Sequence, residues 1–483
     1  MDPEGLKVVP TIVTARNFPE RRLSQTENFS EDKTLVKLRF KDYLVMGSLF
    51  FGMIFGAGNL IFPVHLGQLA GSHWLAAAGG FLLSGVLLPL LALLALGLSR
   101  SNGLDGLARP LGNRARVTLV VLIQLLIGPL FVTPRTTTVS FTVGISSFLP
   151  AHLQGGGLLI YSALFFLFVY LATVNESKIT ALIGKYLNPL FLVILATLFV
   201  LAFLHPFGAA GTAPATAAYQ HQALANGFLQ GYNTMDVLAS LVFGITIIAA
   251  LKDYGITKPA AVSLATIKSG LVGMAGVAAV YLGLIWLGAT SRHRFALASN
   301  GGVTLAQLAH AYLGLAGDLL LAVLTILACI TTAMGLMAAF AQDFHQLFPR
   351  VSYKNFLRAA CLVSFLVANL GLDLIIQWST PVLAFVYPLA ITLVLLGITS
   401  PYFGKAPLVY QLTMGLVTIP AFFDLLKSLP PVLAKTPVVS GLVKWGLRWL
   451  PLYSLGFAWV PFALVGGIVA AGWVHWRTRR RPA

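Results

Sequence analysis

Apolar segments of about 20 residues dominate this chain, and an α-helix of that length crosses roughly 30 Å of hydrocarbon. Of the 483 residues, 57% are hydrophobic and only 10% are charged. This composition excludes a soluble globular protein and a disordered chain. Because a bilayer offers no water to backbone amides, each long apolar run is expected to be a helix. We therefore predict an all-α, polytopic membrane protein.

The apolar runs number about twelve, and the first is expected from about Lys41 to Phe62. Extra bends or a short surface helix are expected within 117–149 and 301–317. The other runs lie near residues 74–98, 117–149, 158–174, 181–204, 228–251, 261–288, 318–341, 356–371, 375–398, 408–426 and 455–476.

Both ends of the chain are polar. Residues 1–34 are mixed in charge and lack a sustained apolar period, which predicts a flexible cytoplasmic tail rather than a signal peptide. Residues 477–483 form a basic tail. Cytoplasmic loops carry an excess of Lys and Arg, and with twelve spans most of the 32 such residues fall on the side of the N-terminus. Both termini are therefore predicted to be cytoplasmic.

The first apolar run, within Phe51–Gln68, is interrupted by residues that weaken a helix. Gly52, Gly56 and Gly58 each cost about 1 kcal/mol relative to Ala, and Pro63 lacks a backbone donor. In hydrocarbon, a broken helix is tolerated where its freed backbone groups face protein, an aqueous cavity or a ligand. The pattern indicates a binding site or, as the alternative, a close helix contact that small residues permit.

A second interruption lies in the sixth run, where Gly231 and Asn233 precede Asp236. Interrupted helices in corresponding positions of two halves are typical of inverted-repeat transporters, which bind substrate and ions near the membrane midplane. Half-helix N-termini attract a carboxylate, and unwound carbonyl groups bind a cation or an ammonium. The second break therefore favours the binding-site interpretation.

This pattern also predicts the domain organisation. A ten-helix transporter core is expected at residues 35–398, with inverted repeats of five helices at about 41–204 and 228–398. Two additional helices are expected within 399–476.

Asp236 is the one carboxylate, and Arg135 the one arginine, predicted to lie well inside a span. An ionised side chain there costs at least about 2.5–3.5 kcal/mol, so each is expected to have a partner or a function. We interpret Asp236 as contributing to ion or substrate binding, with a structural pair as the alternative. Arg135 is its obvious partner, but it could instead cap carbonyl groups freed by Pro129 and Pro134. A structural or gating role is favoured for Arg135.

Thr331 and Thr332 lie in the eighth run and could supply hard oxygen ligands for a small cation, together with carbonyl groups near Gly52 and Phe55. The alternative is that these hydroxyls bond to the carbonyl four residues earlier in their own helix. No other metal site is indicated, because the nine histidines show no metal-ligand spacing.

Catalysis, disulfide formation and nucleic-acid binding are not expected. No nucleophile elbow, phosphate loop, zinc motif or paired carboxylate set occurs, which argues against an enzyme. Cys329 and Cys361 lie in apolar runs and are expected to be core residues. The formal charge of +17 is carried at the ends of apolar runs and not along an aromatic-studded groove, so no nucleic-acid partner is expected.

Several ordered motifs resemble the bacterial branched-chain amino acid:cation symporter family (LIVCS, BrnQ-type), which belongs to the amino acid–polyamine–cation superfamily. The resemblance covers about Leu35 to Trp476. The motifs are Phe-Gly-Ala-Gly-Asn-Leu-Ile-Phe-Pro at 55–63, Gly-Pro-Leu-Phe-Val-Thr-Pro-Arg-Thr at 128–136, Asn-Gly-Phe-Leu-Gln-Gly-Tyr-Asn-Thr-Met-Asp at 226–236 and Asn-Leu-Gly-Leu at 369–372.

The resemblance implies a five-plus-five inverted-repeat (LeuT-like) fold and import of Leu, Ile and Val with co-transported Na⁺ across a bacterial cytoplasmic membrane. The substrate carboxylate would meet the backbone amides of Gly58 and Asn59. The implied sodium ligands are the carbonyl groups of Gly52 and Phe55 and the hydroxyls of Thr331 and Thr332. The implied substrate site comprises Phe55, Gly56, Ala57, Gly58, Asn59, Tyr232, Asn233, Thr234 and Asp236.

Three alternatives remain open from the residues alone. A proton-coupled or broader-specificity amino acid carrier would use Asp236 as its titrating group. A channel would require a pore lined by repeated polar residues, which is not apparent, and a membrane enzyme lacks a catalytic constellation.

Overall fold

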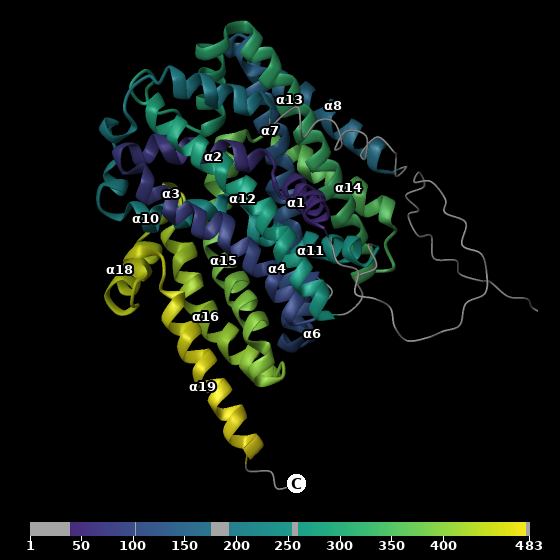
Figure 1. The fold of residues 1–483 in the computed structure, drawn as a ribbon. Coiled ribbons are helices and arrows are strands. Elements are labelled where there is room, and N and C mark those ends of the chain that lie inside the picture. The colour runs from purple at the N-terminus through teal and green to yellow at the C-terminus, as the bar shows by residue number, and fades with distance from the viewer. Residues whose placement is uncertain (1–38, 102, 175–192, 254–258, 480–483) are drawn as a thin grey trace, which may run out of the picture. The chain divides into compact units, whose positions relative to one another are not determined.

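The described part of the chain is built from helices. The computed structural model describes residues 39–101, 103–174, 193–253 and 259–479, and no strand occurs in these ranges. Eight helices there are long and apolar enough to cross a membrane by length and composition (Figure 1). This confirms the all-α membrane class. The predicted tail at 1–34 and part of the predicted run at 181–204 lie outside the described residues.

The first predicted interruption is confirmed. Helix α1 (Phe40–Ile54) ends at an extended Phe55, and α2 (Ala57–Ala70) begins after an extended Gly56. The predicted end of this run at Phe62 is wrong, because α2 continues for two further turns. Pro63 does not stop it, since a membrane helix tolerates a proline where neighbouring groups satisfy the freed carbonyl.

The next helices include the bend that was expected within 117–149. A π-helical turn at Leu126–Leu130 joins two α-helices, and Gly128 departs from helical geometry immediately before Pro129. A second π-helical turn, at Leu83–Leu87, joins α3 to α4. The helices of this region are α3 (Trp74–Leu82), α4 (Leu88–Leu98), α5 (Gly103–Ala108), α6 (Asn113–Leu125), α7 (Val132–Gly144), α8 (Gln154–Val174) and a shorter apolar helix at Val193–Leu204.

The second predicted interruption is also confirmed. Helix α10 (Ala217–Gly231) passes into one 3-10 turn, η8 (Tyr232–Thr234), and α11 (Asp236–Asp253) follows. Met235 between them is left-handed, with φ of 61°, a conformation that few non-glycine residues adopt. The backbone therefore changes direction at a defined point.

The remaining helices include the bend expected within 301–317. Gly314 has φ of +57° inside α13 and divides this helix into two limbs. Helix α15 runs beyond residue 398, which was the predicted end of the transporter core, and α18 is a helix that the apolar runs did not predict. The helices are α12 (Pro259–Ser291), α13 (Gly301–Leu347), α14 (Tyr353–Ala368), α15 (Leu372–Phe403), α16 (Pro407–Lys427), α17 (Pro431–Ala434), α18 (Pro437–Trp449) and α19 (Trp459–Arg479).

Glycines allow two pairs of helices to pack with their backbones in contact. On α2, a Cβ added to Gly67 would lie 1.9 Å from the carbonyl oxygen of Ile285 on α12. On α3, a Cβ added to Gly80 would lie 1.9 Å from the carbonyl oxygen of Leu224 on α10. The α2–α12 and α3–α10 contacts are among the most extensive in the fold. Glycines in these helices therefore allow close packing, in addition to the role of other glycines in interrupting helices at the two breaks.

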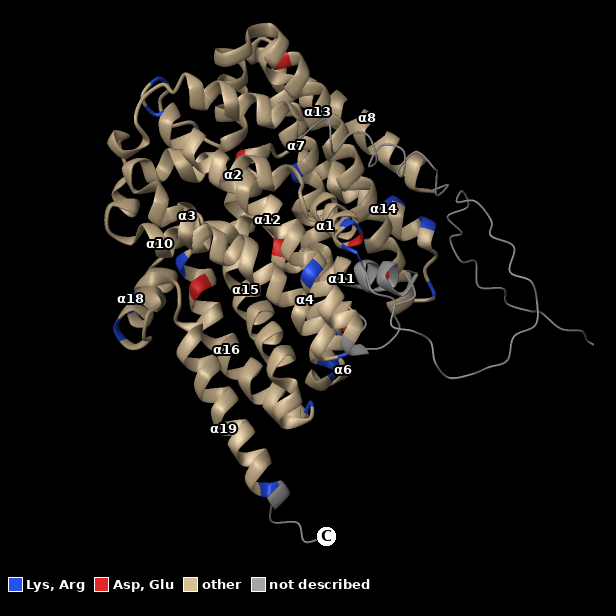
Figure 2. Cartoon of the chain, viewed as in Figure 1, with Lys and Arg blue, Asp and Glu red and all other residues tan. Residues whose placement is uncertain are grey.

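Charged residues lie mainly at helix ends and in connecting segments, while most helices carry none along much of their length (Figure 2). Among the described residues, three charged side chains are buried, namely Arg135, Asp236 and Asp424. The burial of Asp424 was not predicted from the sequence. Asp424 lies in the last turn of α16, where other segments cover it.

Gly80→Ala should lower the melting temperature of the detergent-solubilised protein, because the new methyl group would overlap the Leu224 carbonyl oxygen. Overpacking of this kind typically costs about 1–3 kcal/mol. Gly79→Ala is the matched control on the same helix, since its methyl group meets nothing within 4 Å. It should be neutral or slightly stabilising, because Ala favours a helix by about 1 kcal/mol over Gly. Equal melting temperatures for the two variants would contradict this packing.

Candidate functional site

The two helix breaks meet at one buried group of side chains. Asn59, in the first turn of α2, donates its side-chain N–H to the carboxylate of Asp236 at 2.8 Å. The Tyr281 hydroxyl, from α12, donates to the other carboxylate oxygen at 2.6 Å and accepts a hydrogen bond from Asn59. All three side chains are buried. Two segments separated by 177 residues are thus joined through one carboxylate.

Local hydrogen bonds hold each break in its shape. The side-chain oxygen of Asn59 accepts the backbone N–H of Gly56 at 3.0 Å, and the Asn59 backbone N–H donates to the Gly56 carbonyl at 3.1 Å. The Asn59 amide, which was expected to meet a substrate carboxylate, thus bonds within its own turn in this structure. Ala57 and Gly58 occupy the first two positions of α2, where backbone N–H groups have no acceptor within the helix.

The second break is closed by Thr234, whose hydroxyl donates to the Gly231 carbonyl at 2.9 Å. This bond satisfies a carbonyl that the end of α10 leaves without a helical partner. Tyr232 stacks on Tyr387 of α15, with ring centroids 4.1 Å apart. A cavity of about 260 Å³ lies beside this break, and Tyr232, Asn233 and Gln230 contribute to its lining.

Arg135 of α7 lies between the two breaks. Its guanidinium donates to the Asn233 carbonyl at 2.8 Å and lies 4.9 Å from the ring centre of Phe62. A Cβ added to Gly58 would lie 2.8 Å from a guanidinium nitrogen, so a larger residue there would require the guanidinium to shift. The ion pairs of the described residues do not include Arg135 with Asp236, so the pairing that was one of the two interpretations of Arg135 is not formed. The carbonyl that Arg135 caps was freed by the second break and not by Pro129 or Pro134.

The predicted sodium ligands lie on two neighbouring segments. Gly52 and Phe55 line a void of about 10 Å³ together with Cys329 of α13. A Cβ added to Gly56 would lie 3.8 Å from the Thr332 hydroxyl oxygen, so the first break packs against α13 at this threonine.

The hydroxyls of Thr331 and Thr332 both donate to the Ala328 carbonyl, at 2.8 and 3.0 Å. This is the helix-internal bonding that was the alternative interpretation. This bonding uses the hydroxyl protons but leaves lone pairs on the hydroxyl oxygens that can still coordinate a cation. No group of three or more His, Cys, Asp or Glu that could hold a metal occurs in the described ranges.

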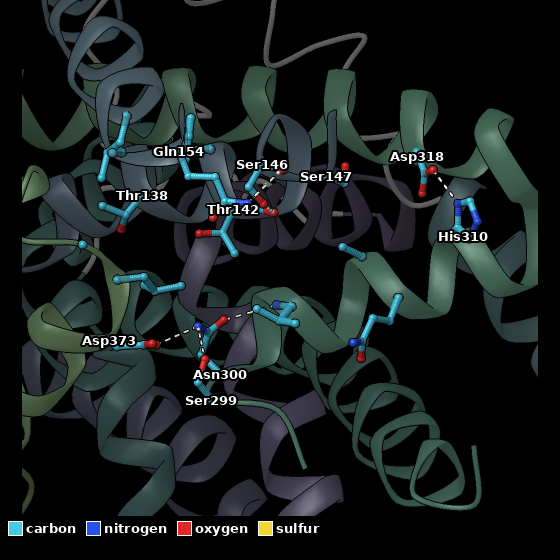
Figure 3. Close-up of a pocket in the computed structure, with 18 of the residues that line it drawn as sticks. Thr138, Thr142, Ser146, Ser147, Gln154, Ser299, Asn300, His310, Asp318 and Asp373 are labelled. Atoms are coloured by element: carbon cyan, nitrogen blue, oxygen red, sulfur yellow. Dashed lines mark hydrogen bonds and ion pairs between the residues drawn. The ribbon is translucent and has the colours of Figure 1, made fainter. Parts of the chain in front are cut away.

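A larger cavity of about 880 Å³ lies between α7, the first limb of α13 and the start of α15. Figure 3 shows Asn300 bonded to Asp373, and His310 facing Asp318. The Asn300 side chain donates to Asp373 at 2.7 Å and accepts from the Gly302 and Val303 amides, which caps α13. The residues of the two breaks do not line this cavity.

Tyr281 is the main site residue that the sequence interpretation missed. A single tyrosine in the apolar run 261–288 carries a hydroxyl that needs a partner inside the membrane. That signal was available, but the partner could not be identified without the packing of α12 on α2.

Comparison with known proteins identifies the family. The model of the family described as "Branched-chain amino acid transport protein" matches residues 39–476. The branched-chain amino acid permease BrnQ of Lactobacillus delbrueckii subsp. lactis is 39% identical over 90% of this chain and 97% of that protein. BraB of Bacillus subtilis is 36% identical over 89% of this chain and 95% of that protein. BrnQ of Escherichia coli K12 is 38% identical over 90% and 96%.

Among solved structures, Mhp1, a nucleobase-cation-symport-1 family transporter, has a similar fold. Its closed form with bromovinylhydantoin bound gives a TM-score of 0.57 at 12% identity, covering 89% of this chain and 92% of that one. The inward-facing form gives 0.57 at 13% identity, covering 86% and 94%. At such low identity the likeness concerns the fold alone.

These relatives are transport permeases of bacteria, so the chain is a multi-pass membrane transport protein and not an enzyme. The family match spans nearly all of the described residues, and the relatives align along almost their whole length. The chain belongs to the branched-chain amino acid transport protein family.

Proposed function

We propose that this permease imports Leu, Ile and Val by Na⁺ symport with alternating access. The fold would comprise twelve spans in a five-plus-five inverted repeat, followed by two additional helices, with both termini in the cytoplasm. The names of the relatives support the substrate class. Mhp1, whose family is named for cation symport, supports cation coupling in a protein of this fold.

The observation that carries this proposal is the meeting of two half-helix N-termini at Asn59 and Asp236. The substrate carboxylate would bind the backbone amides of Ala57 and Gly58, where the dipole of α2 and the nearby guanidinium of Arg135 both favour negative charge.

The substrate ammonium would bind at the second break, among the carbonyl groups of Tyr232, Asn233 and Thr234. A carbonyl that already accepts one hydrogen bond, as Asn233 does from Arg135, keeps a second lone pair. An aliphatic side chain would rest on an apolar wall. Because one methylene is worth only about 1–3 kcal/mol, such a wall would admit Leu, Ile and Val alike.

Na⁺ would bind where the first break packs on α13, with oxygen ligands from Gly52, Phe55, Thr331 and Thr332. Occupation of this site would order the first break and thereby couple the ion to substrate binding. A rocking motion of one helix group against another would then present the site to alternate faces.

The direct test is radiolabelled leucine uptake into proteoliposomes that hold the purified protein. An inward Na⁺ gradient should drive concentrative uptake, and excess unlabelled Ile or Val, but not Lys, should block it. Uptake driven by an H⁺ gradient alone would replace Na⁺ with H⁺ as the coupled ion. No concentrative uptake under either gradient would overturn the assignment.

Tyr281→Phe should weaken leucine binding in the same assay, because it removes a hydrogen bond to the Asp236 carboxylate without changing the ring. A hydrogen bond to a charged group is worth about 1.5–3 kcal/mol, so the apparent KM should rise by roughly tenfold or more. Tyr410→Phe is the matched control, since this hydroxyl is equally buried but bonds to the Leu396 carbonyl. If both variants transport leucine like the wild type, the assignment of the substrate site to the region around Asp236 is wrong.

Replacing Thr331 and Thr332 together by Ala should raise the Na⁺ concentration needed for half-maximal uptake by at least about fivefold, which corresponds to roughly 1 kcal/mol. Thr399→Ala is the control, because its hydroxyl makes the same bond to a carbonyl four residues earlier, on an exposed part of α15. Unchanged sodium dependence in the double variant would exclude these hydroxyls as ligands.

A further inference from the structure

Asp424 is a buried carboxylate for which the proposed transport site has no use. Its residue is 5% exposed, and it lies in the last turn of α16. Both of its carboxylate oxygens are buried, and neither has a hydrogen-bond donor among the described residues. Asp236 differs in this respect, since it receives hydrogen bonds from both Asn59 and Tyr281.

Two side-chain donors near Asp424, those of Lys427 and Tyr453, bond to backbone carbonyl groups. Lys427, three residues further along α16, donates its ammonium to the carbonyl groups of Tyr453 at 2.9 Å and Ser454 at 2.8 Å. The Tyr453 hydroxyl donates to the Phe423 carbonyl at 2.7 Å. No ion pair within 4.0 Å joins Asp424 to a described cation.

The titratable groups that act electrostatically on Asp424 are Lys427, Tyr453 and Tyr232. Of these, only Lys427 is a cation, and its exposed side chain lets solvent screen the attraction. The cations of α18, which packs on α16, are Lys444 and Arg448, and both are exposed, as is Lys435 just before that helix. Burial favours the neutral acid more strongly than the screened charge of Lys427 favours the carboxylate. A buried carboxylate loses its hydration, and without donors no hydrogen bond replaces it.

We infer that Asp424 is a proton-binding site, occupied in this conformation, and that release of its proton is linked to the second helix break. The link is the cavity of about 260 Å³ beside that break, because Tyr232 of the break and Ser428, which directly follows α16, both line it. A negative charge at Asp424 favours any arrangement in which a hydroxyl or water reaches the carboxylate. Ionisation would therefore shift the population away from the arrangement described here.

The presence of the proton can be tested without any transport measurement. Infrared spectra of the purified protein at neutral pH should contain the carbonyl band of a protonated carboxyl group that Asp424→Asn removes. Asp236→Asn is the control and should leave this band in place, because the Asp236 carboxylate has two donors that stabilise its ionised form. If Asp424→Asn does not fold, Asp424→Glu should shift the frequency of the band without removing it, and an unshifted band would overturn the proposal.

The link to the break rests on the proposed transport function and has its own test. Above the pH at which the infrared band has lost half of its intensity, the protonated fraction falls about tenfold per pH unit. Leucine uptake under a fixed Na⁺ gradient should decline with it in the wild type, whereas Asp424→Asn should lose this pH dependence.

The proton site at Asp424 and its link to the second break can be disproved separately. A wild-type spectrum without the band, or a band that survives Asp424→Asn, would overturn the proton site whether or not leucine is transported. Identical pH profiles for the wild type and Asp424→Asn would overturn the link to the second break. A protein with the band but without leucine uptake would overturn the transport proposal alone.

Discussion

The hydrogen bond between Asn59 and Asp236 is the interaction on which the arrangement of the two breaks depends. Each break exposes backbone groups that hydrocarbon cannot satisfy, so neither is stable by itself. The Asn59 side chain stabilises both breaks. Its amide oxygen accepts the Gly56 N–H in its own break, and its amide nitrogen donates to Asp236 at the other break. Tyr281 completes the pairing from a third helix.

Arg135 and Asp236 balance the charge of this region without touching each other as an ion pair. The guanidinium faces the Asn233 carbonyl and the Phe62 ring, and the carboxylate faces neutral donors. This separation leaves the start of α2 with a positive field in which an anion is favoured. A direct ion pair would have cancelled that field, so neutral partners for Asp236 suit the zwitterionic substrate that we propose.

The breaks were predictable from sequence, because Gly56 and Gly231 act on their own backbone. The partner of Asp236 was not, since charge complementarity suggested Arg135 and the choice of Asn59 and Tyr281 depends on how α2 and α12 pack. Asp424 was missed for a similar reason. Its position beside Lys427 at the end of an apolar run resembles a solvated helix end, and only tertiary packing buries it.

The glycine contacts of α2 with α12 and of α3 with α10 have a mechanical consequence. Where two backbones touch directly, no side chain lies between them whose rotation could absorb a displacement. The two helices of each pair therefore resist sliding past each other. Sliding between helices is easier at seams lined by large side chains, such as the stacked rings of Tyr232 and Tyr387, where rotamers can yield.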